Sequence, residues 1–351
     1  MLQTIIPTKL IGPFKINGTY VNSGEKIYVP LSTFETPLWY SVSRGAKVSE
    51  NTTYGISCII VNNVMTRSIL MEANSLLLAN KFIHETLPIE IENIKTIAES
   101  TSKHLNFKSI SSKLIGRNIF LRIEIFPSEA SGHNMVTIAS DKVLRYLTEK
   151  YHDIVRYVSV SGNLCTDKKS SAINSISGRG KYVIASLIIP EEITNKILKT
   201  SNEKIHNLNI KKNLIGSIVA GSIMSANAHF ANMLLAFYLA FGQDAANIVE
   251  GSEGLTTTEI LPNGDLEFSV TLPNLILGTI GNGKHLDFAR ENIRTIGCIN
   301  DDFSAKENGS LRMAEICAAT VLSGELSLMA ALTNEGALTK SHIRIERINK
   351  H

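Results

Sequence analysis

The sequence predicts an α+β protein of two domains, and three observations support this. Helical and strand-like patterns follow one another irregularly along the chain, with no internal repeat. The chain of 351 residues is longer than most single hydrophobic cores. Hydrophobic residues make up 44% and charged residues 19%, which is the composition of an ordinary globular protein.

In the first half of the chain, turn-forming residues dominate up to Ser43-Arg44-Gly45. A helix is expected from Thr66, a plausible N-cap, through the segment 68–85. Residues 117–126 alternate in polarity and predict a strand. A loop of small residues, SEASGHN, then leads to a helix expected to begin near Ser140.

In the second half, a short strand (RYVSVSG) precedes the polar loop NLCTDKKSSAINSISGRGK. A second strand, YVIASLII, is followed by Pro190-Glu191-Glu192, a strong helix start. Then come an apolar helix, a β-rich stretch to Leu277, a glycine loop and two further helices.

The apolar helix is long enough to cross a membrane, since no charged residue lies between Asn213 and Gln243. However, Ser222, Ser225, His229 and Asn232 share one helical face at this spacing. A polar stripe does not suit contact with lipid, so the segment is predicted to be a buried core helix facing a site.

Charge and cysteine content exclude several classes of protein. The formal charge of +3 comes from dispersed basic residues, which gives no reason to expect nucleic acid. The four cysteines never form a Cys-x-x-Cys pair, so neither a zinc site nor a disulfide framework is expected. The N-terminus has no signal-peptide core, and we expect a soluble, cytoplasmic protein with no bound metal.

Four polar groups are candidates for chemistry. Lys168, between Asp167 and Lys169, could stabilise an oxyanion. Asp244 follows the apolar helix, and Glu35 lies near aromatic residues that could raise its pKa. His342 has a useful pKa range. Taken singly, each is more simply interpreted as a solvated surface residue.

The loop Gly278–Lys284 joins a strand to a helix, where backbone N–H groups can approach a phosphate. It nearly fits the P-loop pattern, but His285 replaces the hydroxyl that holds magnesium. A P-loop hydrolase is therefore disfavoured, and a phosphate-bearing ligand is a weak prediction for this loop and for SEASGHN.

Motifs in the same order along nearly the whole chain resemble those of 3-hydroxy-3-methylglutaryl-CoA (HMG-CoA) reductases, closer to the eukaryotic and archaeal class. They are IPTKLIGP, SRGAKV, MTRS, STSKH, GRNIFLRI, SGNLCTDKKSSAIN, GRGK, NLIGSIVAGSI, NAHFAN, GQDAANIVEGS, GTIGNG, GELSLMAAL and TKSH.

The resemblance implies a large, mainly helical substrate domain (1–67 and 158–351) and an inserted ferredoxin-like cofactor domain (68–157). It implies reduction of HMG-CoA to mevalonate and CoA with two NADPH, through a mevaldyl-CoA intermediate, with NADH not excluded. Lys168 would stabilise the oxyanion, Glu35 would supply a proton, Asp244 would tune both, and His342 would protonate the departing thiolate. A homodimer or higher homo-oligomer with shared sites is also implied.

The resemblance further implies two sets of binding residues. Those for the substrate are Arg44, Arg67, Ser161, Asn163, Asp167, Lys169, Lys212, His229 and Asn232. Those for the cofactor are Ser102, Lys103, Glu129, Ser131, Gly132, His133, Asn134, Gly278, Thr279, Gly281 and Gly283. Lys103 stands where the family usually has an arginine for the 2′-phosphate. The alternative is a homologue that binds acyl-CoA or nucleotides without catalysis.

Overall fold

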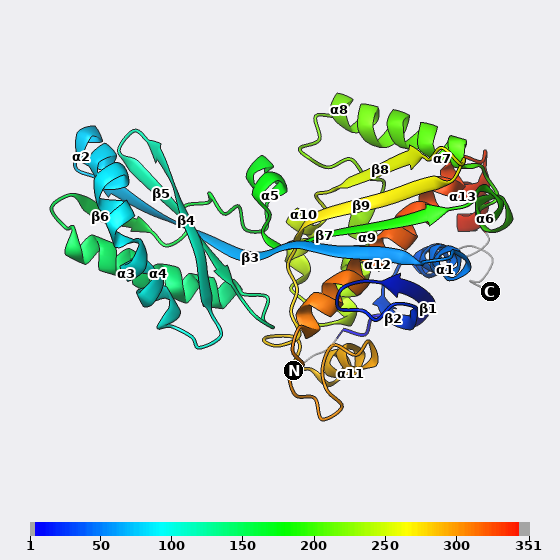
Figure 1. The fold of residues 1–351 in the computed structure, drawn as a ribbon, viewed down its shortest axis with the longest axis horizontal. Helices are drawn as coiled ribbons and strands as arrows, with labels where there is room; N and C mark the ends of the chain where they lie inside the picture. The colour runs from blue at the N-terminus through cyan, green and yellow to red at the C-terminus, as the bar shows by residue number, and fades with distance from the viewer. Residues whose placement is uncertain (1–3, 344–351) are drawn as a thin grey trace.

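The computed structural model describes residues 4–343, apart from the side chains of residues 341 and 342. It shows an elongated molecule with two parts joined by one long strand (Figure 1). The strands are β1 (Thr8–Asn17), β2 (Glu25–Ser32), β3 (Ile56–Ala73), β4 (Asn106–Ile115), β5 (Asn118–Phe126), β6 (Val155–Ser159), β7 (Gly180–Ile189), β8 (Leu255–Ile260) and β9 (Leu266–Leu275).

The helices are α1 (Thr36–Asn51), α2 (Leu76–Lys81), α3 (Leu87–Glu99), α4 (His133–Lys150), α5 (Ala172–Ser177), α6 (Glu191–Ile193), α7 (Asn202–Leu208), α8 (Ser217–Val219), α9 (Phe230–Ala240), α10 (Ile248–Gly251), α11 (Asp287–Thr295), α12 (Gly309–Leu332) and α13 (Ala337–His342). Three π-helical segments, η1 (Phe82–Thr86), η2 (Thr194–Leu198) and η3 (Asn209–Gly216), and the 3₁₀ turn η4 (Ala245–Asn247) join them. The α+β class predicted from the sequence is confirmed.

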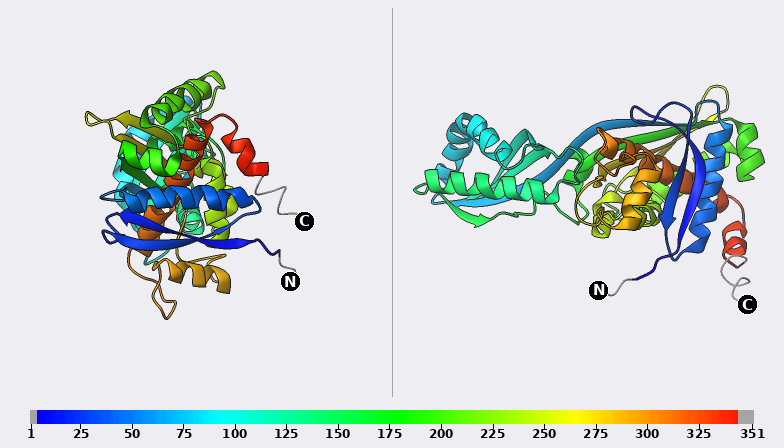
Figure 2. Two further views of the ribbon diagram at one scale, coloured as in Figure 1. Left: turned by 90° about the vertical axis from the view of Figure 1, so that its right-hand side faces the viewer. Right: turned by 90° about the horizontal axis from the view of Figure 1, so that it is seen from below.

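The larger part is built on strands in the order β2-β1-β3-β7-β9-β8. Helix α12 lies along this sheet and packs against α1, α9 and β7 (Figure 1). Figure 2 shows the β1–β2 hairpin beside α1, in agreement with the contacts between α1 and β1. Apolar side chains from these elements form one core. This part therefore holds more sheet than the sequence predicts.

The smaller part has its own apolar core. Its strands follow the order β4-β5-β3-β6, with all neighbours antiparallel. Helices α3 and α4 pack on each other, and α4 also contacts β3 (Figure 1). Each part can therefore bury apolar surface by itself, which is the property expected of a domain.

The prediction of a helix starting at Thr66 is wrong, because β3 continues through this position to Ala73. Residues 65–72 pair with β5, and residues 70–73 also pair with β6. Pairing on both edges outweighs the local helical pattern. The helix starts only after Ser75, whose side chain accepts a hydrogen bond from Leu78 N.

Helix α4 begins at His133, seven residues before the expected start near Ser140. The residue before it, Gly132, has a φ of 91° and is the N-cap. The glycine turn therefore comes directly before the helix. This places the end of the SEASGHN loop at a helix N-terminus.

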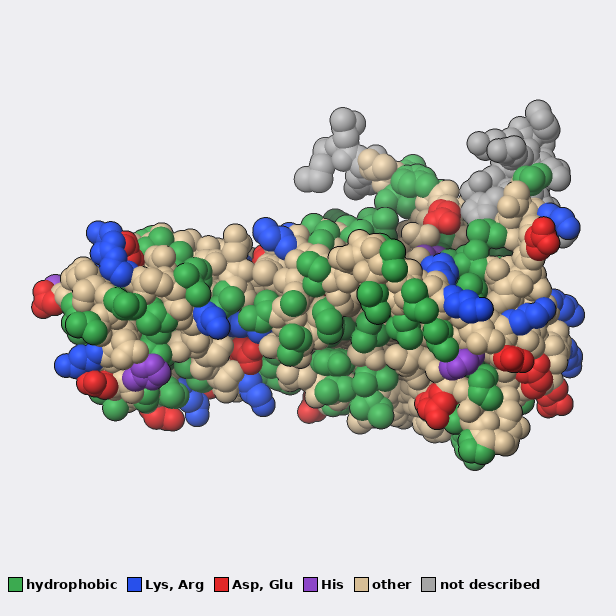
Figure 3. Space-filling model, turned by 90° about the horizontal axis from the view of Figure 1, so that it is seen from above, with side chains coloured by type: hydrophobic (Ala, Val, Ile, Leu, Met, Phe, Trp, Pro, Cys, Tyr) green, Lys and Arg blue, Asp and Glu red, His purple; other side chains and the backbone are tan. Residues whose placement is uncertain are grey.

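The prediction of one buried helix within the charge-free segment between Asn213 and Gln243, over residues 218–242, is also wrong. The chain leaves helix at Val219 and re-enters it at Phe230. Ser222 and Ser225 lie in the intervening loop, so the predicted polar stripe does not form. Val219 is 82% exposed, and Figure 3 shows hydrophobic side chains gathered on this face of the molecule.

In the described part of the chain, the helix with the length and apolarity of a membrane span is α12. However, 83% of its most apolar window is buried inside the protein. Its apolar residues contribute to the core of the larger part. Burial in the core accounts for its composition.

Candidate active site

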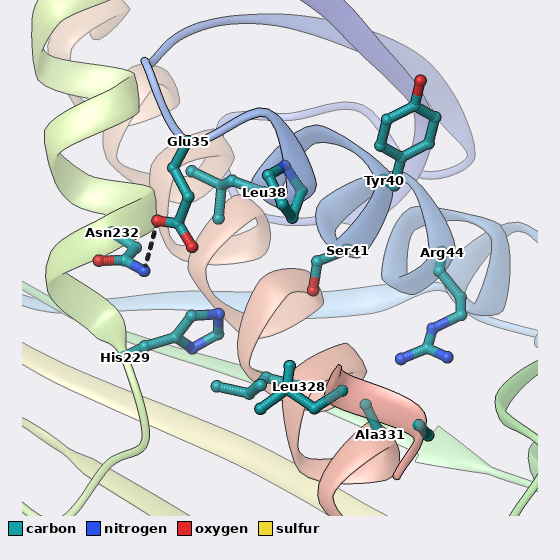
Figure 4. Close-up of a pocket in the computed structure, with 12 residues that line it drawn as sticks. Glu35, Leu38, Tyr40, Ser41, Arg44, His229, Asn232, Leu328 and Ala331 are labelled. Atoms are coloured by element: carbon teal, nitrogen blue, oxygen red, sulfur yellow. Dashed lines mark hydrogen bonds between the residues drawn. The ribbon is translucent and has the colours of Figure 1, made fainter. Parts of the chain in front are cut away.

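Glu35 lines a pocket of about 390 Å³ between α1, α9 and α12 (Figure 4). It is the N-cap of α1, where Pro37 in the first turn fixes the helix start. Its Oε2 accepts a hydrogen bond from Asn232 Nδ2 at 2.9 Å. The carboxylate is therefore held by one amide, and its other oxygen faces the pocket.

His229 and Arg44 line the same pocket. His229 Nδ1 lies 3.0 Å from Oε2 of Glu325, a buried carboxylate on α12. Glu325 also accepts the backbone N–H groups of Ala228 and His229. This carboxylate fixes the turn before α9 and orients the imidazole. Arg44 donates through Nε to Ser327 Oγ at 3.0 Å.

Lys168 forms the second centre of the site. Its Nζ lies 2.6 Å from Asp244 Oδ2, and the two side chains are 40% and 44% exposed. Burial is the largest single influence on Asp244 and would raise its pKa. The hydrogen bond and charge of Lys168, together with the backbone N–H of Ala246, outweigh burial and lower the pKa. The pair is accessible, so a ligand can reach the ammonium and exclude water from it, as oxyanion stabilisation requires.

The loop that carries Lys168 is held by buried charges beneath it. Lys168 has a φ of 58°, and its backbone N–H donates to Glu250 Oε1 at 3.1 Å. Arg179 is completely buried and pairs with both Glu250, at 3.0 Å, and Asp167, at 2.9 Å. Glu253 accepts the backbone N–H of Ser171. These contacts fix the loop in a strained conformation that places the lysine side chain above Asp244.

Arg67 lies at the other side of the lysine loop. It donates to Thr137 Oγ1 at 2.8 Å and lies 3.9 Å from Asp167 and 3.4 Å from Ser161 Oγ. Lys169 Nζ donates a hydrogen bond to the backbone carbonyl of Asp167. Arg67, Ser161 and Lys169 therefore lie near one another at the lysine loop, and cationic and hydroxyl groups of this kind suit a carboxylate ligand.

The two glycine-containing loops meet in a third region. Ala130 pairs with Ile280 through an isolated bridge, and Glu129 O accepts Thr279 N. A Cβ on Gly278 would lie 2.5 Å from Ser131 N, so only glycine allows this approach. The loops enclose a pocket of about 320 Å³. It is lined by Ala130, Ser131, Gly132, His133, Asn134, Met135, Asp244, Ile280, Gly281, Asn282 and Lys284.

His133 begins α4 within this pocket. Burial and the nearby Arg179 lower the pKa of His133 to about 4 despite Asp167 and Asp244. The imidazole is therefore neutral at pH 7, and its buried Nε2 has no hydrogen-bond partner in the described part of the chain.

Comparison with known proteins agrees with this geometry. Residues 3–347 match the family model described as hydroxymethylglutaryl-coenzyme A reductase. A 3-hydroxy-3-methylglutaryl-coenzyme A reductase of Aeropyrum pernix is 40% identical over 96% of this chain and 78% of its own length. That of Methanocaldococcus jannaschii is 40% identical over 97% and 82%.

The chain belongs to the hydroxymethylglutaryl-coenzyme A reductase family. The resemblance found in the sequence, and with it the prediction of a reductase enzyme, is confirmed.

The fold also matches solved HMG-CoA reductases. The reductase of Streptococcus pneumoniae has a TM-score of 0.72 at 16% identity, covering 95% of this chain and 86% of that one. A structure of the class II reductase from the same organism, bound to NADPH in open conformations, has a TM-score of 0.69 at 16% identity, with 95% and 86% covered. At this identity the likeness concerns the fold.

The site residues expected of an HMG-CoA reductase fall into separate groups. Glu35, Arg44, His229 and Asn232 share one pocket. Lys168, Asp244, Asp167, Arg67 and Ser161 gather at the lysine loop, which Asn163 enters with a φ of 62°. Glu35 lines the pocket between α1, α9 and α12, whereas Asp244 lines the pocket between the two glycine-containing loops.

Three predicted residues lie elsewhere. Lys212 is on η3 and contacts Asn213. Ser102 and Lys103 lie in the turn after α3, next to His104, which lines a further pocket of about 480 Å³. The predicted acid His342 ends α13, but its side chain lies outside the described residues.

Several residues of this reductase site escaped the sequence analysis. They are Arg179, Glu250, Glu253 and Glu325. All four are charged residues in otherwise apolar or small-residue segments, and such residues are rarely buried without a partner. That contrast is the signal in the sequence that could have identified them.

Proposed function

We propose that this chain reduces HMG-CoA to mevalonate and CoA with two NADPH, through a mevaldyl-CoA intermediate. The observation that carries the proposal is the Lys168–Asp244 pair, 2.6 Å apart and open to solvent. An ammonium fixed in this way stabilises the oxyanion that forms when a thioester or aldehyde carbonyl is reduced.

Each residue has a distinct task in this mechanism. Lys168 binds the carbonyl oxygen, and Asp244 holds the ammonium in place. Glu35 donates a proton to the oxyanion as the alcohol forms, and Asn232 orients its carboxyl group. His342 protonates the CoA thiolate as the thiohemiacetal collapses. Arg67, Ser161 and Lys169 bind the free carboxylate of the substrate.

NADPH fits the third pocket. The close approach at Gly278, the open space around Gly281 and the uncapped N-terminus of α4 form a cradle for a phosphate-bearing ligand. When bound, the dinucleotide supplies the hydride. Ser131, His133 and Asn134 would position it beside Asp244. Ser102 and Lys103 would contact the 2′-phosphate. NADH is the alternative reductant.

We also propose that the active site is completed between two subunits. Glu35 and the Lys168–Asp244 pair occupy different pockets of one chain, although the chemistry needs both at one carbonyl. The apolar side chains of Ile215, Ile218 and Val219 are exposed, as expected of a surface that a partner covers (Figure 3). A homodimer, soluble and cytoplasmic, is the simplest assembly.

The smaller part is proposed to be an inserted ferredoxin-like domain at 68–157, within a substrate domain formed by 1–67 and 158–351. Its β-α-β-β-α-β order and the antiparallel strand order β4-β5-β3-β6 support this. Its α4 N-terminus contributes to the cofactor pocket.

The first test is the stoichiometry of the reaction. Purified protein should oxidise two NADPH for each CoA thiol released from HMG-CoA. Folded protein that binds HMG-CoA but oxidises neither NADPH nor NADH would contradict the proposal.

A mixing experiment tests the shared site. Glu35→Gln and Lys168→Ala each remove activity from a homodimer. In their heterodimer, one site receives both intact residues and the other receives neither. A statistical mixture should therefore recover about a quarter of wild-type activity. Recovery of none, with heterodimers demonstrated by tagged purification, would place both residues in one subunit's site.

A further inference from the structure

Lys284 ends the glycine loop, and the reaction as described leaves it without a role. The side chain is only 6% exposed. Its backbone N–H donates to Gly281 O, whereas its Nζ has no hydrogen-bond or ion-pair partner within residues 4–343. Because a largely enclosed lysine with no described counter-ion is unfavourable, its position on the pocket wall suits an anion from outside the chain.

The neighbouring carboxylates are already engaged. Asp244 faces Lys284 across the pocket, but its Oδ2 lies 2.6 Å from Lys168 Nζ. Glu129 accepts hydrogen bonds from Thr279 Oγ1 and Ser310 N. Lys181, a second buried lysine nearby, adds positive charge and donates to Leu277 O. No described carboxylate lies within ion-pair distance of Lys284.

The walls of the pocket add to its preference for an anion. Helix α4 has 18 residues, and its N-cap Gly132 provides no side-chain cap. Its positive end opens into the pocket that Lys284 lines. A Cβ on Gly281 would meet nothing within 4 Å, so the opposite wall leaves room for a ligand.

The position of the pocket identifies the anion. On one side it reaches Asp244, beside the proposed hydride acceptor. On the other it shares Ala130, Met135 and Ile280 with the pocket lined by His104, the neighbour of Lys103. A dinucleotide that extends from Lys103 to Lys168 would place its central diphosphate in this pocket.

We propose that Lys284 binds the diphosphate of the dinucleotide. This rests on the proposed function, because it assumes that a dinucleotide is the reductant. The lysine then acts as the lysine of a P-loop does, without the magnesium-binding hydroxyl that His285 replaces.

The test compares ligand binding by Lys284→Met, Lys284→Arg and Lys204→Met. Lys204 is an exposed lysine on α7 and serves as the matched loss of charge. Titration calorimetry with NADP⁺ should show affinity reduced by about tenfold or more in Lys284→Met, because a charge-assisted contact is lost. Lys284→Arg should stay within about threefold of wild type, and Lys204→Met should not change.

A second ligand locates the contact. 2′-AMP carries the 2′-phosphate but no diphosphate, so Lys284→Met should bind it as wild type does. Equal loss for NADP⁺ and 2′-AMP, or unchanged NADP⁺ affinity, would overturn the proposal. So would a raised KM for HMG-CoA with an unchanged KM for NADPH.

The pH dependence provides a check that does not require Lys284→Met to fold. Burial lowers the pKa of Lys284 to about 8, although Asp244 raises it. Wild-type affinity for NADP⁺ should therefore fall as the pH rises through 8, and Lys284→Arg should show a smaller fall. Lys181 titrates in the same range and is retained in the arginine variant, whereas His133 stays neutral. An equal fall in both proteins would overturn the proposal.

All these measurements use NADP⁺ without turnover. Tight binding of NADP⁺ with no reduction of HMG-CoA would contradict the proposed function and leave the Lys284 result interpretable.

Discussion

Two lysine–carboxylate pairs of similar length serve different purposes in this molecule. In the smaller part, Lys150 Nζ lies 2.8 Å from Glu90. At the lysine loop, Lys168 Nζ lies 2.6 Å from Asp244. Glu90 also accepts hydrogen bonds from Tyr146 and Tyr151, whereas no second side chain in the described part of the chain donates to Asp244.

The surroundings account for the difference. Burial raises the pKa of Glu90, but hydrogen bonds from Lys150, Tyr146, Tyr151 and Asn93 outweigh it and lower the pKa to about 2. Every strong acceptor position is filled, and the cluster joins α3 to α4. By contrast, the Lys168 ammonium bonds to Asp244 and retains N–H groups that can donate to a ligand. Its loop is held by Arg179 and Glu250. The Glu90 cluster therefore has a structural role, whereas the Lys168–Asp244 pair can still bind a ligand.

The sharpest contrast should come from removing each lysine. Lys168→Ala should lower kcat by about a thousandfold, because the preorganised oxyanion contact is lost. Lys150→Met should leave kcat for the folded enzyme near wild type. Steady-state assays with thermal unfolding curves would measure both. A similar loss of kcat in the two variants would remove the distinction.

The second largest effect on kcat is expected from weakening the buried contacts of Glu250 that support the lysine loop. Glu250→Gln loosens the contacts to Lys168 N and Arg179, and kcat should fall by about ten- to hundredfold through misplacement of the lysine. Affinity for NADP⁺ should not change. Glu267→Gln on β9 removes a carboxylate that accepts from Ser186 and is the matched control. Wild-type kcat in Glu250→Gln would show that the loop needs no such support.

A smaller effect, on stability alone, is expected at Glu90. Glu90→Gln weakens bonds to two tyrosines and a lysine and should lower the free energy of unfolding by about 2 kcal/mol. Denaturant titration would measure this. An accompanying change in kcat would mean that the cluster acts on the active site.

The smallest effect is the pH dependence of that stability. The folded pKa of Glu90 is lower than its usual value of 4.5, so the unfolded state binds more protons between about 2 and 4.5. The stabilisation is therefore present above pH 4.5 and is lost as the pH falls toward 2. Glu90→Gln should show a shallower decline in this window than wild type. Identical slopes would assign acid unfolding to other carboxylates.

The sequence predicted the family, the α+β class and the strands 117–126 and 182–189, because motif order and short-range alternation are local properties. It did not predict that β3 would continue past Thr66, since pairing with β5 and β6 depends on segments about 50 and 85 residues away along the chain. The polar stripe failed for a related reason. Glu325, far along the chain, fixes the turn before α9 and ends the apparent helix there.

The candidate site shows the same limit. Glu35, Lys168 and Asp244 were identified because their motifs are contiguous. Arg179 and Glu250 were missed because their role depends on a buried contact between segments 71 residues apart in sequence. Lys284 stood in a recognised motif, but only its burial and the lack of a partner for its Nζ among the described residues distinguish it from a solvated lysine.

Strand β3 also limits which changes of length the chain can tolerate. Its 18 residues contribute Ile56 and Cys58 to one core, and Ile69 and Met71 to the other. The register of β3 shifts between Ile60 and Asn62, and side chains alternate between faces beyond that point. Deleting one residue between Val64 and Thr66 would therefore turn one half of the strand over relative to the other. Such a deletion would expose one core or move Arg67 away from Ser161 and Asp167. Related sequences should therefore vary freely at exposed positions of this strand while keeping its residue count.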